Sequence, residues 1–265
     1  MSSSDGERSV SLVACAACVA AILLFQYLVS AQPLDAAQND VKHRGDLHVQ
    51  RKLQHVGTGV MIYAASRFFG PLAGATVLLV FAVLFYGLHE LRGRSEAVNS
   101  AYIKCFRTIL RQYEVSRAAL PGAYYFLLGS GLSLALFPPR VARLAILHLS
   151  VGDPAAAFFG TLYGRHKLVA LVGKVGGAKS MEGAVGCLCA TAAATFAALV
   201  VERDFYFDVV DGDFGAVAGM ISTISLAAGV GAAAAELLDV GGWDDNVTLP
   251  LLSGLFLQLT VGGLL

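Results

Sequence analysis

The stretch Val151-Gly152-Asp153-Pro154-Ala155-Ala156-Ala157 lies inside an otherwise apolar segment that extends from Val141 to Gly164. As a helix, this segment would span roughly 36 Å at about 1.5 Å per residue, which is enough to cross a bilayer. Lipid cannot solvate the charge of Asp153, and Pro154 is expected to interrupt the helix. A chain keeps an acid at such a depth when the acid lines a polar cavity, so Asp153 indicates chemistry inside or at the edge of a membrane.

The composition is that of a membrane protein. Hydrophobic residues make up 56% of the 265 residues, charged residues make up 14%, and the mean hydropathy is +0.66. A soluble protein carries about 25% charged residues. The formal net charge of zero argues against a nucleic-acid-binding protein, which is normally basic. We divide the chain into an N-terminal anchor helix with a basic loop, 1–50, and a membrane domain, 51–265.

Apolar runs of membrane-spanning length recur along the chain and predict an all-α, polytopic membrane helix bundle with seven or eight transmembrane helices. The runs are 11–30, 56–69, 72–89, 122–137, 141–163, 183–201, 214–238 and 247–265. The second run is short and contains Arg67, and the last run is either a crossing or a re-entrant hairpin. A membrane-embedded helix bundle is therefore the expected fold class.

The distribution of cations orients these helices by the positive-inside rule. With the N-terminus outside, the predicted inner loops hold 14 of the 19 Lys and Arg residues. We therefore expect residues 92–117 and 165–179 to face the cytosol. The first run also resembles a signal peptide that ends at Val29-Ser30-Ala31, but its length of about 20 residues favours an anchor helix.

Four polar clusters fall on the predicted inner side. The first is Arg51-Lys52-Leu53-Gln54-His55, although cations at a membrane boundary are also typical of side chains that snorkel to the interface. In the second cluster, Asp153 is expected to cap a half-helix that begins at Pro154. The same cluster ends with Arg165, His166 and Lys167, and its small residues recur every four positions, a spacing that lets another helix approach closely. They are Ala156, Gly160 and Gly164.

The third cluster is Gly173-Lys174-Val175-Gly176-Gly177-Ala178-Lys179-Ser180-Met181-Glu182-Gly183. It differs from the P-loop pattern at Ala178 and follows no strand, so we reject a P-loop fold. A Gly-rich turn, the Lys179 ammonium and a helix that begins at Ser180 still favour a phosphate, and a surface linker is the plain alternative. The fourth cluster, Trp243-Asp244-Asp245-Asn246-Val247-Thr248-Leu249-Pro250, offers carboxylates and an amide of the kind that bind Mg²⁺.

Together the clusters resemble the CTP-dependent lipid kinase family, which includes dolichol, phytol and farnesol kinases and CTP-type diacylglycerol kinases. The matching pieces are Arg51-Lys52-x-x-His55, Gly152-Asp153-x-x-Ala156-x-x-x-Gly160-x-x-x-Gly164, Lys179-Ser180-x-Glu182-Gly183 and Asp245-Asn246-x-Thr248-x-Pro250, in the order of the family. Phosphatidate cytidylyltransferase is similar in the middle two motifs and lacks the last one. Its own signature is not found in this sequence, so the kinase branch is favoured.

The resemblance implies transfer of the γ-phosphate of CTP to the hydroxyl of a membrane lipid alcohol, giving a lipid monophosphate and CDP. It implies Mg²⁺ as the cofactor, with Asp153, Asp245 and Asn246 as its ligands. Either Asp153 or His55 would take the proton of the alcohol, and the resemblance adds Lys179 and Glu182 to the catalytic residues. The implied contacts to CTP are Arg51, Lys52, Lys167, Gly176, Gly177, Ser180 and Gly183.

Two other functions stay open from the sequence. One is synthesis of a CDP-lipid by a reaction of the phosphatidate cytidylyltransferase type. The other is an ion-coupled transporter that uses Asp153, although transporters often contain paired broken helices and only one is expected here. We expect an integral protein of the endoplasmic reticulum membrane whose site faces the cytosol and whose partners are CTP, the lipid alcohol and the bilayer. The identity of the alcohol and assembly into a homo-oligomer stay open.

Overall fold

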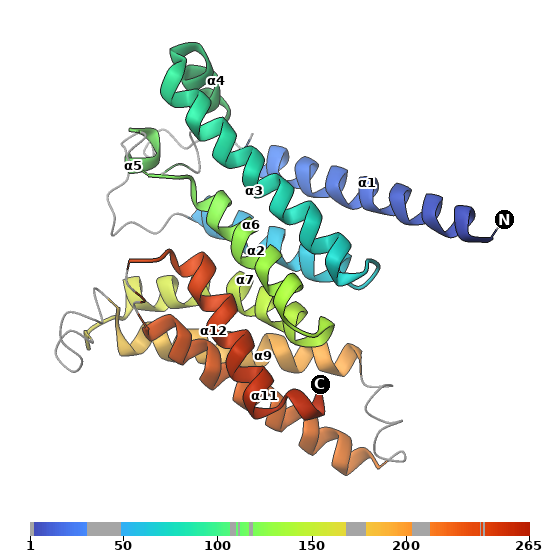
Figure 1. Ribbon diagram of the computed structural model, residues 1–265. Coiled ribbons are helices and arrows are strands. Elements are labelled where there is room, and N and C mark those ends of the chain that lie inside the picture. Colours follow the sequence, from blue (N-terminus) through green and yellow to red (C-terminus); the bar gives the residue numbers. More distant parts are fainter. Residues whose placement is uncertain are drawn as a thin grey trace. The chain divides into compact units, whose positions relative to one another are not determined.

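The computed structural model describes residues 3–30, 49–106, 110, 112–116, 119–167, 179–202, 213–238, 240 and 242–265. Within these residues the chain is helical, and its β structure is an isolated antiparallel bridge between Lys167 and Ser180. The chain divides into two compact units, Met1–Gly131 and Leu132–Leu265. The expected boundary at residue 50 stays a prediction. Figure 1 labels the helices of both units.

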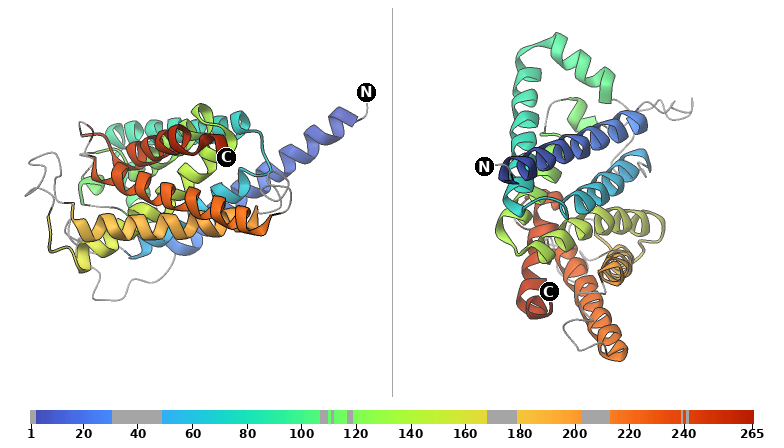
Figure 2. Two further views of the ribbon diagram at one scale, coloured as in Figure 1. Left: turned by 90° about the horizontal axis from the view of Figure 1, so that it is seen from below. Right: turned by 90° about the vertical axis from the view of Figure 1, so that its right-hand side faces the viewer.

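In the part of the chain that the structure describes, the first unit contains five helices and the beginning of a sixth. They are α1 (Ser3–Ser30), α2 (Val49–Ala65), α3 (Pro71–Arg94), α4 (Glu96–Phe106), α5 (Gln112–Val115) and α6 (Gly122–Leu136). α1 packs on α2 (Figure 2), where the side-chain amide of Gln54 donates to the carbonyl of Gln26 at 3.4 Å. α2 begins at Val49 rather than at residue 56, so the first polar cluster lies inside the helix and not before it.

The described residues of the second unit contain four long helices that pack into a bundle. Its helices are α7 (Pro139–Leu162), α9 (Met181–Val201), α11 (Phe214–Leu237) and α12 (Asp245–Thr260), and a 3₁₀ turn follows at Gly262–Leu264. α7 and α11 each pack against both α9 and α12, which closes the bundle. The largest fully buried apolar side chains of this unit form its core: Val141, Ile146, Leu149, Leu199, Ile224, Val247, Leu249 and Leu257.

The two ends of this bundle differ in chemistry. At one end, Arg140 and Arg143 of α7 each lie 3.8 Å from the carboxylate of Glu202, which follows α9. We call this the Glu202 end. At the opposite end, the backbone bridge between Lys167 and Ser180 joins the residues after α7 to the start of α9. We call this the Lys179 end, because the side chain of Lys179 reaches α11 and α12 there.

The expected interruption at Pro154 is wrong. α7 continues through Pro139–Leu162 with Pro154 buried in its interior. The proline removes one backbone N–H from the helix, but α9 and α12 both pack on α7 and hold it together, as neighbouring helices do for prolines in membrane proteins. Asp153 therefore lies within a continuous helix and is not a helix cap.

Four helices of the described residues are long and apolar enough to cross a membrane: α3, α7, α9 and α11. Shorter apolar helices lie at Val13–Val29 and Gly122–Leu136. The chain is thus a helical membrane protein, as predicted, whereas the expected total of seven or eight crossings is not confirmed by these residues. Small residues bring the long helices together, as is usual where lipid supplies no hydrophobic driving force between helices.

Gly229 provides a test of this packing. A Cβ at Gly229 of α11 would lie 2.8 Å from the backbone oxygen of Leu188 in α9, so Gly229→Ala should lower the unfolding temperature of the purified protein in detergent. Overpacking of this kind costs about 1–3 kcal/mol. Gly219→Ala is the matched control on the same helix, because its Cβ would meet nothing within 4 Å. Equal melting temperatures for the two variants would contradict the packing of α11 on α9.

Candidate functional site

Lys179 connects the ends of three helices in the second unit. It precedes α9, and its Nζ donates to Oδ1 of Asp245, the first residue of α12, at 3.0 Å. The same Nζ donates to the backbone carbonyl of Glu236 near the end of α11 and lies 3.8 Å from Oε1 of that residue. The side chains of Lys179 and Glu236 are only 20% and 10% exposed, so this cation is held among acids in a partly desolvated position.

Asp153 contributes a further negative charge to this end of the bundle. Its side chain is half-buried in α7. Partial burial raises the pKa of Asp245, the charge and hydrogen bond of Lys179 oppose that rise, and the charges of Asp153 and Asp244 add to it. We call Asp153, Lys179, Glu236 and Asp245 the Lys179 cluster. Because it contains three carboxylates and one ammonium, the cluster favours a further cation.

The start of α9 is fixed to the residues that follow α7. Ser180 caps α9, and its side chain accepts a hydrogen bond from the backbone N–H of Gly183 at 3.2 Å, as the sequence predicted for a helix that begins there. Glu182 contacts His166, which follows α7. Its carboxylate accepts from the backbone N–H of His166 at 3.2 Å and lies 2.7 Å from Nδ1 of the His166 ring.

The predicted close approach of a helix to the small residues of α7 is confirmed. A Cβ at Gly183 of α9 would lie 2.8 Å from the carbonyl oxygen of Ala156 and 3.5 Å from Cα of Gly160. Any larger residue at Gly183 would push the two helices apart. The small residues therefore bring the start of α9, which carries Lys179 and Ser180, against the half of α7 that carries Asp153.

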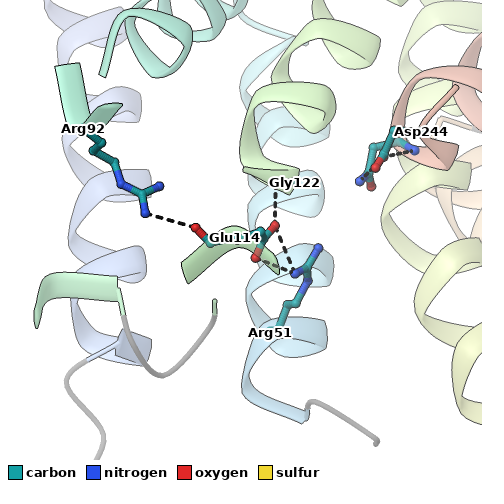
Figure 3. Close-up of polar contacts among 6 residues, drawn as sticks. Arg51, Arg92, Glu114, Gly122 and Asp244 are labelled. Carbon is teal, nitrogen blue, oxygen red and sulfur yellow. Dashed lines mark hydrogen bonds and ion pairs between the residues drawn. The ribbon is translucent and has the colours of Figure 1, made fainter. Parts of the chain in front are cut away.

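Asn246 is buried and held by its neighbour. Its side-chain amide donates to Oδ1 of Asp244 at 2.6 Å, and its backbone N–H donates to the same oxygen at 2.9 Å. Asp244 thereby caps α12 (Figure 3). The family resemblance also implies that Lys167, Gly176 and Gly177 contact CTP. Lys167 is exposed, and the two glycines lie outside the described residues.

The first polar cluster lies on α2 of the first unit. Nη1 of Arg51 donates to the Glu114 carboxylate at 3.2 Å, as Figure 3 shows. The ring of His55 packs edge-on against Phe126 of α6, with 4.8 Å between centroids. Lys52 is half-buried beside them. Arg51 is thus held by an acid that the sequence analysis did not select.

Two acids were missed by the sequence analysis, Glu236 and Glu114. Each had a weak signal. Glu236 lies one residue before the end of an apolar, Ala-rich helix, where an acid is unusual. Glu114 is an acid within the basic segment between α4 and α6. Neither belongs to a recognisable motif, and only the fold places them beside Lys179 and Arg51.

The possible metal ligands near Lys179 can be compared with the coordination that Mg²⁺ prefers. Among the residues that the structure describes, no group of three or more His, Cys, Asp and Glu side chains is arranged to hold a metal ion. Mg²⁺ usually takes one or two carboxylates and completes its shell with water and substrate phosphates. Asp153 and Asp245, whose charges act on each other, match such an incomplete site, which a bound phosphate would have to complete.

These observations define a helical membrane protein with a cluster of acids around one lysine at one end of a helix bundle. Comparison with known proteins finds two relatives. The CTP-dependent diacylglycerol kinase 1 of Saccharomyces cerevisiae is 27% identical over 190 residues, which cover 70% of this chain and 63% of that protein. The protein of the same name from Eremothecium gossypii is 26% identical over 180 residues, which cover 66% and 54%.

The two matches confirm the family resemblance: the chain is related to the CTP-dependent lipid kinases. It spans less than two thirds of the length of these curated relatives. No protein-family model and no solved structure matches the chain.

Lys179→Met tests the cluster. The substitution leaves Asp245 and Glu236 without their shared cation, so the unfolding temperature should fall near neutral pH. Folding raises the pKa of Asp245, so the folded state binds this proton more tightly than the unfolded state does. Lowering the pH through that pKa should therefore restore stability to the variant. Adding Asp245→Asn should also restore part of it, whereas Lys104→Met, which removes an exposed cation from α4, should change little. A Lys179→Met variant as stable as wild type at neutral pH would contradict the cluster.

Proposed function

We propose that the protein transfers the γ-phosphate of CTP to the hydroxyl of a membrane lipid alcohol, and that diacylglycerol is this alcohol. One structural observation carries the proposal: Lys179 of the third polar cluster donates to Asp245 of the fourth, 66 residues away in the sequence, at one end of a membrane bundle. The similarity to two proteins named CTP-dependent diacylglycerol kinase 1 supports the nucleotide and the lipid. Dolichol and phytol are the alternative alcohols, because their hydroxyls offer the same chemistry.

Phosphoryl transfer depends mainly on alignment and on neutralisation of phosphate charge. Lys179 would exchange part of its contact with Asp245 for a phosphate oxygen, and the start of α9 would favour the same anion through its helix dipole. Mg²⁺ held by Asp153 and Asp245 would supply additional positive charge at the phosphates. Asp153 or His55 would take the proton of the lipid hydroxyl, and Asn246, fixed by Asp244, would support the carboxylates.

The position of the Lys179 cluster suits a substrate with an apolar tail and a polar hydroxyl. The helices that cross the membrane expose apolar side chains along their length, including Leu226 and Val230 of α11 and Val185 of α9. A lipid tail would stay in contact with such surfaces while its hydroxyl reaches the Lys179 end. We propose that this end faces the cytosol at the endoplasmic reticulum membrane, because 14 of the 19 cations lie on the predicted inner side.

Labelled CTP tests the reaction. Purified protein with diacylglycerol and Mg²⁺ should transfer label from the γ-phosphate of CTP to lipid, and label in the cytosine ring should stay in the nucleotide. Asp153→Asn should lower the rate by two or more orders of magnitude, which corresponds to about 3 kcal/mol of transition-state stabilisation. The variant should still fold, because a neutral amide is easier to place in a membrane helix than a carboxylate.

Asp213→Asn is the matched control. Asp213 caps α11 at the Glu202 end, and asparagine caps a helix about as well as aspartate, so the rate should stay near that of wild type. Cytosine label in the lipid product would assign the cytidylyltransferase reaction instead. Equal turnover with ATP would reject the family-based choice of nucleotide, and an Asp153→Asn variant with most of the wild-type rate would remove Asp153 from the mechanism.

A further inference from the structure

Among the described residues, Arg51 of α2 donates hydrogen bonds through one of its guanidinium nitrogens. Its Nη1 donates to Oε2 and Oε1 of Glu114 at 3.2 and 3.4 Å. Within the described residues, Nη2 and Nε of Arg51 make no hydrogen bond. The side chain is 16% exposed. A guanidinium has five N–H donors in a planar fork, so the donors on Nη2 and Nε remain available for a second, external acceptor.

Glu114 is itself fixed from several directions, as Figure 3 shows. Its side chain is 3% exposed, and its Oε1 accepts from the backbone N–H of Gly122 at 2.8 Å. Its backbone carbonyl accepts from Nη2 of Arg92 at 3.0 Å. The fully buried Arg92 is in turn fixed by Asn99 and by the ring of Tyr102, 3.9 Å from its guanidinium carbon. The short helix α5, too short to be stable alone, is thereby held in place.

Gly122 provides a second, independent observation. A Cβ at this position would lie 2.6 Å from Nη2 of Arg51 and 3.5 Å from Oε1 of Glu114. The Glu114 contact prevents the guanidinium from moving away without losing its hydrogen bonds. The position of Arg51 therefore requires a residue without a side chain at the start of α6, next to Nη2, which donates to no acceptor among the described residues.

We propose that Glu114 and Gly122 form a cradle that fixes the Arg51 guanidinium so that its Nη2 and Nε donors can bind a phosphate of a nucleotide. Glu114 is then a positioning residue that acts through Arg51 and does not touch the nucleotide. In the bidentate pair that a carboxylate forms best with a guanidinium, two parallel hydrogen bonds come from two different nitrogens on one edge. Here the carboxylate takes Nη1 only. The inference rests on the proposed use of a nucleoside triphosphate.

Three variants test the cradle in the full-length protein. Glu114→Gln removes the charge that holds Arg51, and Gly122→Ala displaces the guanidinium without changing any charge. Each should raise the KM for CTP and its directly measured Kd by about tenfold, the loss expected for one misaligned charge-assisted hydrogen bond, with kcat within about twofold of wild type. Arg51→Ala should raise both constants at least as much. In the Arg51→Ala background, neither Glu114→Gln nor Gly122→Ala should add a further change.

Two matched controls separate positioning from general destabilisation. Gly87→Ala also adds a methyl group to a helical glycine of the first unit, where nothing lies within 4 Å of the new Cβ. Glu202→Gln removes another little-exposed carboxylate that pairs with arginines, at the Glu202 end of the second unit. Both should leave the KM for CTP unchanged, although Glu202→Gln is expected to lower the unfolding temperature.

If Glu114→Gln or Gly122→Ala raised the KM for CTP further in the Arg51→Ala background, the inference would be overturned, since these positions would then act by another route. A Gly122→Ala variant with the wild-type KM would overturn it as well, and this test holds even if Glu114→Gln does not fold. A wild-type protein that neither binds nor turns over CTP would reject the proposed function together with the cradle. A wild-type protein that uses CTP, with Glu114→Gln and Gly122→Ala variants of normal KM, would reject the cradle alone.

Discussion

The ammonium group of Lys179 is the interaction on which the end of the second unit depends. It contacts the end of α11 through Glu236 and the start of α12 through Asp245, while its own backbone leads into α9. Carboxylates this close together repel one another, and partial desolvation strengthens that repulsion. A single cation placed between them allows three helix ends to meet. The cluster still contains more acidic than basic side chains. This excess negative charge favours an additional cation, including a cation that is bound to a phosphate.

Helix packing brings Asp153 to this cluster. Gly183 lets α9 approach the carbonyl oxygen of Ala156, three residues after Asp153 on α7. α12 packs on α7 as well, so the acid of one apolar helix lies near the start of another. The result is a polar cluster that joins the interior of α7 to the ends of α9, α11 and α12. Such a position suits a reaction between a water-soluble nucleotide and a lipid hydroxyl, because the nucleotide stays largely in water and the lipid stays largely in the bilayer.

Several local features around the Lys179 cluster were predictable from the sequence, and the reasons are physical. Asp153 is costly in an apolar helix, Ser180 is a strong helix cap, and small residues every four positions indicate a close helix contact. Helical character and membrane insertion followed from composition and from the length of the apolar runs. The resemblance to the CTP-dependent lipid kinases rested on four short motifs, and the two relatives confirm it.

Other features depend on tertiary contacts that local sequence does not reveal. Pro154 was expected to break α7, but packing against two neighbouring helices overrides the local preference. The roles of Glu236 and Glu114 arise only from the helices that meet beside them. The full number of crossings also needs more than hydropathy, since α2 begins at Val49, before its apolar run, and is not among the four apolar helices of spanning length.

The central claim is that the Lys179 end of the bundle meets the aqueous side from which CTP is supplied. Single cysteines introduced as Arg165→Cys and Asp213→Cys, in a variant without the native cysteines, would mark the two ends, since both positions are exposed. In sealed vesicles, an impermeant thiol reagent should reach Arg165→Cys only from the side on which added CTP supports lipid phosphorylation, and Asp213→Cys only from the other side. Labelling of both positions from one side, or use of CTP only from the Asp213 side, would contradict the account.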